Sequence, residues 1–233
     1  MLLHCRNTIH DFSRLLFPHY CSGCGNDLKD RDAVICYRCM SELPSTNFFS
    51  TPNNPVEKSF YGRLHLEAAG ASYYFTKDSL LQVLIAELKY KQNISVGLFL
   101  GRMMGYQLML SKRFSSVDYI IPMPLHPKKL KLRGYNQASI IASGIQSIWN
   151  KPIIENAIER TVFSKSQTKQ DRLHRWENME GIFALKNQSK ITHKHLLLVD
   201  DVTTTGASIE AVGSVLQALE GVKLSVATAA YTV

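Results

Sequence analysis

The stretch LLLVDDVTTTGAS, residues Leu196 to Ser208, constrains the fold more than any other part of this chain. Its continuous apolar run predicts a strand that is buried on both faces. Two adjacent aspartates and a threonine-rich turn follow the strand, and a helical pattern then continues from Gly206 to Glu220. A strand that leads through a tight turn into a helix is typical of α/β proteins, which build ligand sites at this end of the sheet.

The turn between this strand and the helix has the features of an anion site. The first turn of a helix offers backbone N–H groups without intrahelical partners and the positive end of the helix dipole. Hydroxyl side chains in the turn add donors, and a glycine allows the backbone to approach a ligand closely. A phosphate monoester fits this set of donors. The expected phosphate-binding residues are Val202, Thr203, Thr204, Thr205, Gly206, Ala207 and Ser208.

The carboxylates of Asp200 and Asp201 would repel a phosphate unless they face another group. Aspartate oxygens accept hydrogen bonds from the vicinal hydroxyls of a ribose, and hard cations prefer oxygen ligands. A ribose 5-phosphate that is joined to pyrophosphate and accompanied by Mg²⁺ satisfies all of these groups together. The simpler alternative is a turn that only caps the helix. A Walker-type GxxxxGK[ST] loop is absent from the sequence, and no GxGxxG follows a strand.

The rest of the chain alternates between helical and strand patterns. Strands that are separated by helices predict a parallel sheet with helices on both faces, which is an α/β fold. Residues 58–75 alternate in polarity and contain two glycines, which favours a hairpin. Further elements are expected as helices over 2–17, 78–90, 95–112 and 136–149, and as strands over 117–123, 152–158 and 223–231.

Proline and cysteine divide the chain into a small module and a main domain. Three prolines among serine, threonine and asparagine predict a linker over 44–57. The linker would separate an N-terminal helix and cysteine module over 1–43 from a main domain over 58–233. The module holds two CxxC pairs with 11 residues between them, formed by Cys21, Cys24, Cys36 and Cys39.

Four thiolates from two CxxC turns can complete a closed tetrahedral site for a structural Zn²⁺. The spacing between the pairs is shorter than in the usual zinc ribbon but still permits a small hairpin. A disulfide pair and a redox CxxC are the alternatives, and a cytoplasmic location disfavours disulfides. His19 is a further candidate ligand, whereas Cys5 is expected to pack inside the first helix.

Charge and hydropathy limit the partners and the location of the chain. The formal net charge is +8, which is explained either by a basic solvated surface or by an anionic partner. Between Tyr119 and Ile154 there is no acidic residue, while several lysines and Arg133 fall there. The longest apolar stretch, 96–110, is interrupted by Arg102 and is too short to span a bilayer. We find no secretory signal pattern, and we expect a cytoplasmic protein.

Three segments together resemble one protein family. The stretch from Leu196 to Ser208 resembles the motif that binds phosphoribosyl pyrophosphate (PRPP) in type I phosphoribosyltransferases. The segments PMPLHPKKLKLRGYNQA, Pro122 to Ala138, and ERTVFSKSQTKQDRLHRWENMEGIF, Glu159 to Phe183, resemble the ComF family, which is associated with DNA uptake in bacteria. With the cysteine module, the resemblance covers nearly the whole chain.

The resemblance implies a type I phosphoribosyltransferase (Rossmann-like) fold with a small zinc ribbon. It implies that Asp200 and Asp201 hold the ribose and that Mg²⁺ accompanies PRPP. Arg133 and Arg175 are the expected pyrophosphate contacts, and 164–175 is the expected mobile loop. The leading interpretation is a PRPP-dependent transferase with an unnamed acceptor.

A protein of a different class, a DNA-processing accessory or ligand sensor without turnover, is the alternative. The zinc module would then bind single-stranded DNA, since its neighbours include several tyrosines and phenylalanines that can stack on bases. A purely structural module is the plainer possibility for the same residues. The family resemblance also implies competence proteins, among them helicases, as partners.

Overall fold

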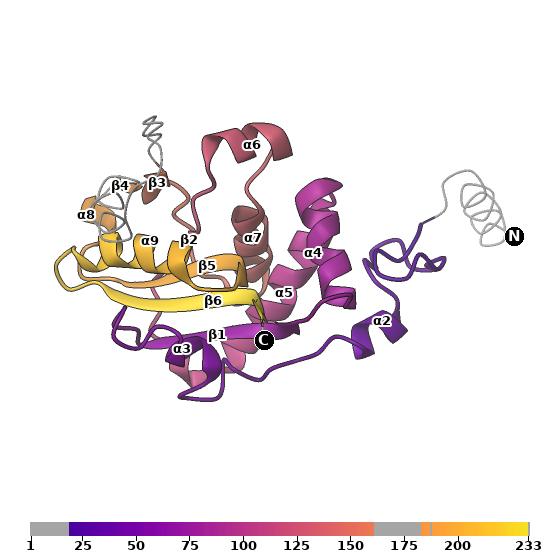
Figure 1. Cartoon of the computed structure of the whole chain (residues 1–233), viewed down its shortest axis with the longest axis horizontal. Coiled ribbons are helices and arrows are strands. Elements are labelled where there is room, and N and C mark those ends of the chain that lie inside the picture. The colour runs from indigo at the N-terminus through magenta and orange to yellow at the C-terminus, as the bar shows by residue number, and fades with distance from the viewer. Residues whose placement is uncertain (1–18, 161–182, 187, 233) are drawn as a thin grey trace, which may run out of the picture.

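A computed structural model describes residues 19–160, 183–186 and 188–232 of the chain (Figure 1). The expected helix over 2–17 and Cys5 lie outside the described residues. Most of the segment expected to close over the site, including Arg175, lies outside them as well.

A four-stranded parallel sheet forms the centre of the molecule, with the strand order β1-β6-β5-β2. This arrangement confirms the predicted α/β fold with a parallel sheet. The strands predicted over 117–123 and 223–231, and the one predicted from the apolar run at Leu196, are confirmed with shifted ends. The four strands are β1 (Ala68–Phe75), β2 (Tyr119–Pro122), β5 (His195–Thr203) and β6 (Lys223–Thr232).

The predicted hairpin over 58–75 is wrong. Only β1 forms in that range, and it pairs in parallel with β6, so that Ala68 lies opposite Ser225. Gly62 has a φ of 72° in a turn before the strand, but Gly70 lies within β1 and does not mark a turn. A Cβ atom at Gly70 would lie 2.7 Å from the ring of Phe49, so this glycine makes room for a close packing contact.

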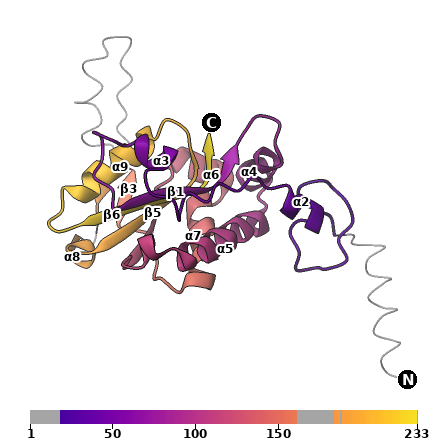
Figure 2. The same ribbon diagram turned by 90° about the horizontal axis from the view of Figure 1, so that it is seen from below.

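Helices cover both faces of the sheet. The side chains of β5 alternate between the two faces, so that the strand contributes to a separate core on each side. Leu197 and Val199 face the core under α4, α5 and α7, whereas Leu196 and Leu198 face the core under α3 and α9. Figure 2 shows α5 and α7 on the side of the sheet opposite α3 and α9. The helices are α3 (Pro55–Lys58), α4 (Leu80–Tyr90), α5 (Ile94–Leu110), α7 (Gln137–Trp149) and α9 (Ala207–Gln217).

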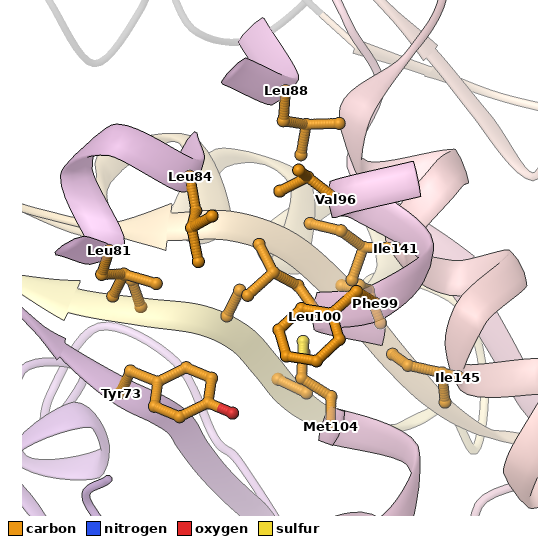
Figure 3. Close-up of a cluster of buried hydrophobic side chains, with 14 of the residues drawn as sticks. Tyr73, Leu81, Leu84, Leu88, Val96, Phe99, Leu100, Met104, Ile141 and Ile145 are labelled. Carbon is orange, nitrogen blue, oxygen red and sulfur yellow. The ribbon is translucent and has the colours of Figure 1, made fainter. Parts of the chain in front are cut away.

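The first core is built mainly from α4, α5 and α7 (Figure 3). The helices α5 and α7 approach closely at Gly101, which has no side chain. A Cβ atom at this position would lie only 2.2 Å from the carbonyl oxygen of Ile141. Leu84, Leu100 and Met104 are fully buried in this core. The packing fixes α4 against the sheet, which matters below because α4 carries a side chain into the site.

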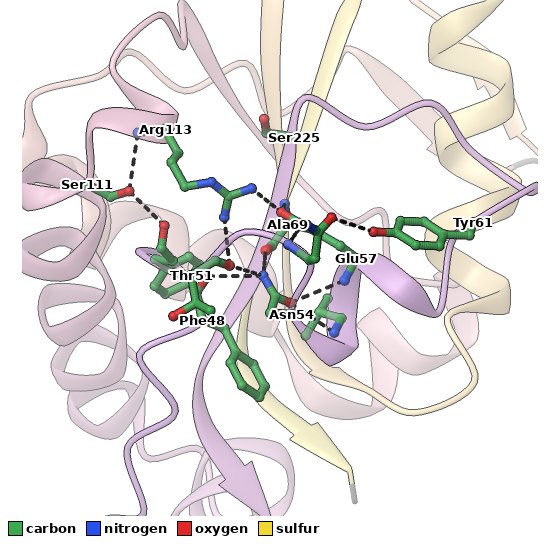
Figure 4. A network of polar contacts seen from close by, with 12 residues as sticks. Phe48, Thr51, Asn54, Glu57, Tyr61, Ala69, Ser111, Arg113 and Ser225 are labelled. Carbon is green, nitrogen blue, oxygen red and sulfur yellow. Dashed lines mark hydrogen bonds and ion pairs between the residues drawn. The ribbon is translucent and has the colours of Figure 1, made fainter.

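The segment 44–57, expected as a linker, packs tightly against β1 (Figure 4). Phe48 and Phe49 are buried, and Asn54 donates hydrogen bonds to the carbonyl oxygens of Phe48, Thr51 and Ala69. These contacts connect the segment to the main domain as part of its core. The domain division at 43/44 and 57/58 stays a prediction.

The remaining elements lie around this framework. The short strands β3 (Ile158–Arg160) and β4 (Phe183–Leu185) pair in antiparallel fashion, and Ile153 makes an isolated bridge to Ile120 where a strand over 152–158 was expected. No helix in the described part of the chain has the length and apolar character that a bilayer span requires. The other helices are α2 (Tyr37–Ser41), η1 (Lys112–Phe114), α6 (Pro127–Arg133) and α8 (Gln188–Ile191).

Candidate phosphoribosyl site and cysteine cluster

A pocket of about 160 Å³ opens at the carboxyl ends of β2 and β5. The parallel register of the two strands explains its position, since Pro122 lies opposite Val199 and the acid pair follows directly. A second, smaller hollow adjoins it along the turn after β5 and shares Asp200. The charged side chains that line the main pocket are Lys89, Lys129, Arg133, Arg160, Asp200 and Asp201.

In the turn after β5, the N-cap position of α9 is Gly206, which has no side chain to cap the helix, and the hydroxyl of Thr205 accepts only a long hydrogen bond of 3.4 Å from the N–H of Ala207. Gly206 has a φ of 73°, a left-handed conformation that favours glycine. A Cβ atom there would also lie 2.7 Å from the ring of Phe60. The adjoining hollow runs along residues 202–209, so the uncapped helix start faces an open space. This arrangement can hold an anion by backbone N–H groups.

Arg63 fixes the outer side of this turn. Its guanidinium donates to the carbonyl oxygens of Ser59 and Thr205 at 2.9 and 3.0 Å, and it pairs with Glu210 on α9. The carbonyl group of Thr205 is therefore held at Arg63. The sequence analysis did not single out this arginine, because it lies 142 residues from the turn that it contacts.

The hydroxyl groups of the turn point in different directions. Thr204, Thr205 and Ser208 are exposed at the hollow, as a phosphate ligand requires. Thr203 is buried, and its hydroxyl donates to the hydroxyl of Thr228 at 3.2 Å. Of the predicted phosphate contacts, Thr203 can therefore contribute only through its backbone.

The two carboxylates of the acid pair have different partners. One Asp200 oxygen accepts a hydrogen bond from the backbone N–H of Asp201 at 2.8 Å. Asp201 is buried, and both of its oxygens lie 2.9 Å from the ammonium of Lys89. Lys89 on α4 was missed in the sequence analysis. A signal for it exists, because Lys89 continues the buried stripe that runs through Leu81 and Ile85 at four-residue steps.

Burial raises the pKa of Asp200, the neighbouring charge of Asp201 adds to the rise, and the resulting pKa is about 7. The backbone hydrogen bond from Asp201 and the charges of Lys89 and Lys129 act in the opposite direction. A carboxyl group with this pKa is poised between its two protonation states near neutral pH. Such groups concentrate at ligand and catalytic sites.

Arg133 lies at the end of α6, on the rim of the main pocket. Its guanidinium donates to the side-chain oxygen of Gln137 at 2.6 Å and lies 5.6 Å from the centre of the Tyr90 ring. The segment after β2 therefore brings a basic side chain to the pocket, and the expected contact of Arg133 with pyrophosphate stays a prediction. Arg160 reaches the same pocket from β3 and stacks over Phe183.

The donor set of the pocket suits a hard divalent cation. Within the described residues, the second oxygen of Asp200 has no hydrogen-bond or ion-pair partner, and Asp200 lines both hollows. Carboxylate oxygens are the ligands that Mg²⁺ prefers, usually together with water and substrate phosphates. Asp200 is therefore the residue that would hold Mg²⁺.

The four cysteines of the two CxxC pairs form one cluster, with all sulfur atoms within 4.8 Å of one another. The sulfur atoms of Cys24 and Cys36 lie 3.7 Å apart, far longer than a disulfide bond. Zinc–sulfur bonds of about 2.3 Å in a tetrahedron separate neighbouring sulfur atoms by roughly 3.8 Å. The cluster therefore suggests a zinc site with four thiolate ligands.

Backbone N–H groups support these sulfur atoms. The N–H of Cys36 donates to the sulfur of Cys21 at 3.2 Å, and that of Cys39 donates to the sulfur of Cys36 at 3.4 Å. Burial raises the pKa of Cys21, but hydrogen bonds from Cys24, Cys36 and other backbone groups outweigh it and bring the pKa to about 6. Burial raises the pKa of Cys39 well above the usual range of a thiol.

His19 is not positioned as a metal ligand, since its Nε2 lies 2.7 Å from the carbonyl oxygen of Ala33.

The cysteine module packs against α4. The side-chain amide of Asn93, just after this helix, donates to the hydroxyl of Ser22 at 3.1 Å. Cys21 and Cys39 belong to the same buried cluster as Leu81 and Leu84.

Comparison with known proteins finds relatives whose names refer to competence or DNA utilization. The chain is 24% identical to "Competence protein F" of Haemophilus influenzae over 231 residues, which cover 93% of this chain and 90% of that protein. It is also 24% identical to "Competence protein ComFC" of Bacillus subtilis, over 76% of this chain and 75% of that protein. The resemblance to the ComF family is confirmed. No protein-family model matches this ComF-like chain.

Two further matches are more limited. The ComF-like chain is 25% identical to "DNA utilization protein YhgH" of Escherichia coli O157:H7, over 58% of this chain and 60% of that protein. A structure of Leishmania donovani UMP synthase is similar with a TM-score of 0.36 and 15% identity, over 77% of this chain and 32% of that chain.

Proposed function

We propose that this chain binds PRPP together with Mg²⁺ and transfers or recognises its 5-phosphoribosyl group. The observation that carries the proposal is one continuous site with three kinds of group. An uncapped helix start suits the 5-phosphate, an acid pair suits the ribose hydroxyls and the cation, and basic side chains suit the pyrophosphate.

The chemistry of PRPP gives each group a task. Breaking the bond between C1 of the ribose and pyrophosphate leaves positive charge on the sugar and negative charge on the leaving group. Basic side chains on the pocket rim, Arg133 among them, stabilise the negative charge, with Lys129 and Arg160 beside it. The sequence assigns the same task to Arg175, which lies outside the described residues. Mg²⁺, when bound, neutralises charge on the phosphate oxygens.

Calorimetric titration with PRPP and Mg²⁺ tests the proposal directly. We expect saturable binding to the wild-type chain and at least a roughly 100-fold loss of affinity in the Asp200→Ala, Asp201→Ala double variant, since each charge-assisted hydrogen bond contributes about 1.5–3 kcal/mol. Asp78→Asn is the matched control, because Asp78 is exposed in the turn before α4. No binding by the wild-type chain would contradict the proposal, and release of pyrophosphate with an acceptor would identify an enzyme.

For the cysteine cluster we propose one structural Zn²⁺ per chain, held by Cys21, Cys24, Cys36 and Cys39. All four sulfur atoms converge, and backbone N–H groups donate to two of them. Metal analysis of the purified chain should give one zinc, and a Cys39→Ser variant should give less. A zinc content of zero in freshly reduced protein would contradict this assignment.

A DNA-linked role is the second candidate, with or without turnover of PRPP. Two observations favour it: a net charge of +8, and exposed Tyr20 and Tyr37 on the cysteine module, which are 57% and 87% exposed. Relatives that carry competence and DNA-utilization names support it as well. Single-stranded oligonucleotides should bind with an affinity that falls steeply with salt and is reduced in Tyr37→Ala. The absence of binding at low salt would exclude this role.

A further inference from the structure

The helix α4 brings one lysine to the floor of the candidate pocket. The ammonium of Lys89 lies 2.9 Å from both oxygens of Asp201, and the two side chains are 21% and 11% exposed. Water screens this ion pair much less than it screens pairs on the surface. The contact spans 112 residues of sequence, so the fold itself brings the two groups together.

Packing holds Lys89 in this position. Leu81, Ile85 and Leu88 are buried on the same helix, and Leu88 accepts a hydrogen bond through its carbonyl oxygen from the hydroxyl of Tyr135. The stem of Lys89 therefore leaves the helix next to its buried stripe, and the ammonium extends from the stem to the pocket. The buried side chains of α4 and the contact with Tyr135 therefore hold the backbone from which Lys89 extends.

The two acids of the pair consequently differ in what they can bind. Asp201 has a cation at both oxygens, whereas Asp200, which lines both hollows, uses one oxygen for the N–H of Asp201 and has no partner at the other among the described residues. An ionised carboxylate has about four lone-pair sites, so Asp201 can still accept hydrogen bonds from neutral hydroxyl groups. A divalent cation at Asp201 would be repelled by the ammonium of Lys89.

We propose that Lys89 is a positioning residue that reserves Asp201 for the ribose hydroxyls by occupying the place that a divalent cation would otherwise take. Asp200 is then the member of the acid pair that is open to the metal. This inference rests on the proposed function, since it divides the work of the acid pair at the same site.

The test uses Mn²⁺ alone as the first probe, because it prefers the same oxygen ligands as Mg²⁺ and its free concentration is measured by electron paramagnetic resonance. Removal of the ammonium leaves two adjacent carboxylates, so Lys89→Met should bind Mn²⁺ on the order of tenfold more tightly than the wild-type chain. The same variant should bind PRPP with Mg²⁺ roughly tenfold more weakly, since Asp201 is no longer reserved for the sugar. A role in stability alone would not produce these opposite changes.

Two variants control the measurement. Lys91→Met removes a lysine just after the same helix, where Lys91 is 71% exposed and pairs with Glu87 at 2.8 Å, and it should change neither affinity. Lys89→Arg retains a cation at Asp201 and should keep the Mn²⁺ affinity within about threefold of the wild-type value.

A substitute for the test variant is available as well. Lys89→Gln removes the charge but can still donate a hydrogen bond to Asp201, and it replaces Lys89→Met if that variant does not fold.

The outcomes separate this inference from the proposed function. If neutral variants at position 89 bind Mn²⁺ no more tightly than the wild-type chain, the inference about Lys89 is overturned, whatever happens with PRPP. If they bind Mn²⁺ more tightly but neither they nor the wild-type chain bind PRPP, the competition between Lys89 and the metal is supported and the phosphoribosyl function is overturned. Tighter Mn²⁺ binding together with weaker PRPP binding supports both.

Discussion

Glu57 and Asp201 each lie below the surface against one basic side chain, yet their surroundings differ. Glu57 pairs with Arg113, and its oxygens also accept hydrogen bonds from the backbone N–H groups of Asn53 and Ala69 (Figure 4). Asp201 pairs with Lys89 at the floor of an open pocket, and Asp200 beside it keeps an oxygen without a partner among the described residues.

The comparison separates a polar cluster that stabilises the fold from one that is prepared for a ligand. Around Glu57 the donors and acceptors satisfy one another, as buried polar groups in stable structures generally do. Around Asp200 the protein leaves an open carboxylate oxygen, an uncapped helix start and a raised pKa within one site. Groups that are left unsatisfied at the end of a parallel sheet need a ligand to satisfy them, and they reduce stability until it binds.

The largest expected effect is on stability and belongs to the first cluster. Glu57→Ala leaves the partly buried Arg113 without its carboxylate partner and the buried N–H of Ala69 without its acceptor. Breaking a buried ion pair from one side costs about 3–5 kcal/mol. We therefore expect the free energy of unfolding in urea to fall by this amount. The affinity of the remaining folded protein for PRPP should not change, because the cluster does not line the pocket.

A surface pair gives the matched control for this change. Glu42 forms an ion pair with Arg38 at 2.9 Å, and the two side chains are 52% and 80% exposed. Glu42→Ala should cost less than about 0.5 kcal/mol. If Glu57→Ala cost as little as Glu42→Ala, the segment 44–57 would behave as the loose linker that its composition first suggested, and the contrast between the two clusters would fail.

The fold was predictable wherever one stretch of sequence contains its own signal. The strand β5 and the helix α9 follow from an apolar run, a turn and a helical period within one segment, and α4, α5 and α7 follow from their own periodicity. The hairpin over 58–75 failed because the partner of β1 is β6, which lies at the other end of the chain. Local alternation shows that a strand forms but does not show which strand pairs with it.

The candidate site shows the same limit. The acid pair and the turn after β5 lie next to each other in sequence, so the donors and acceptors that they offer could be read directly from it. Lys89 and Arg63 could not be assigned to the site, because their partners lie more than 100 residues away. The burial of Thr203 was also unforeseen, since side chains alternate along β5 and the turn begins only after this residue.

The second prediction concerns Asp200, where a substitution should raise the free energy of unfolding, whereas Glu57→Ala should lower it. Folding raises the pKa of Asp200 to about 7, so folding favours its protonated form. The stability from this group is complete below its pKa in the unfolded chain, near 4, and is lost as the pH rises through 7. Asp200→Asn removes this loss, so the variant should be more stable than the wild type at pH 8 by roughly 1–3 kcal/mol and nearly equal to it at pH 4.

Urea unfolding at both pH values measures this difference, and PRPP titration on the same samples should show a large loss of affinity. A variant that is stabilised but no longer binds would show that the site sacrifices stability for binding. A stability difference that does not depend on pH would contradict the raised pKa. Destabilisation at pH 8 would place Asp200 with Glu57 in the structural class.

Arg63 shares features of both clusters, since it supports the fold and also fixes the turn after β5. Arg63→Met frees the carbonyl group of Thr205 and breaks the contact with Glu210. We expect the affinity for ribose 5-phosphate to fall roughly 5- to 10-fold, which corresponds to about 1–1.4 kcal/mol. Arg38→Met, on an exposed side chain, should leave this affinity unchanged, and an equal loss in both variants would show only the effect of net charge.

The smallest expected effect concerns two neighbouring threonines with opposite surroundings. The hydroxyl of Thr203 donates to Thr228 inside the protein, while Thr204 is exposed at the smaller hollow along the turn. Thr203→Val should lower the free energy of unfolding by less than about 1.5 kcal/mol and leave the affinity for ribose 5-phosphate unchanged. Thr204→Val should do the opposite, with a several-fold loss of affinity and unchanged stability. If both variants weakened binding equally, β5 would have to end before Thr203, and the boundary between the structural and the ligand-binding hydroxyl groups would move by one residue.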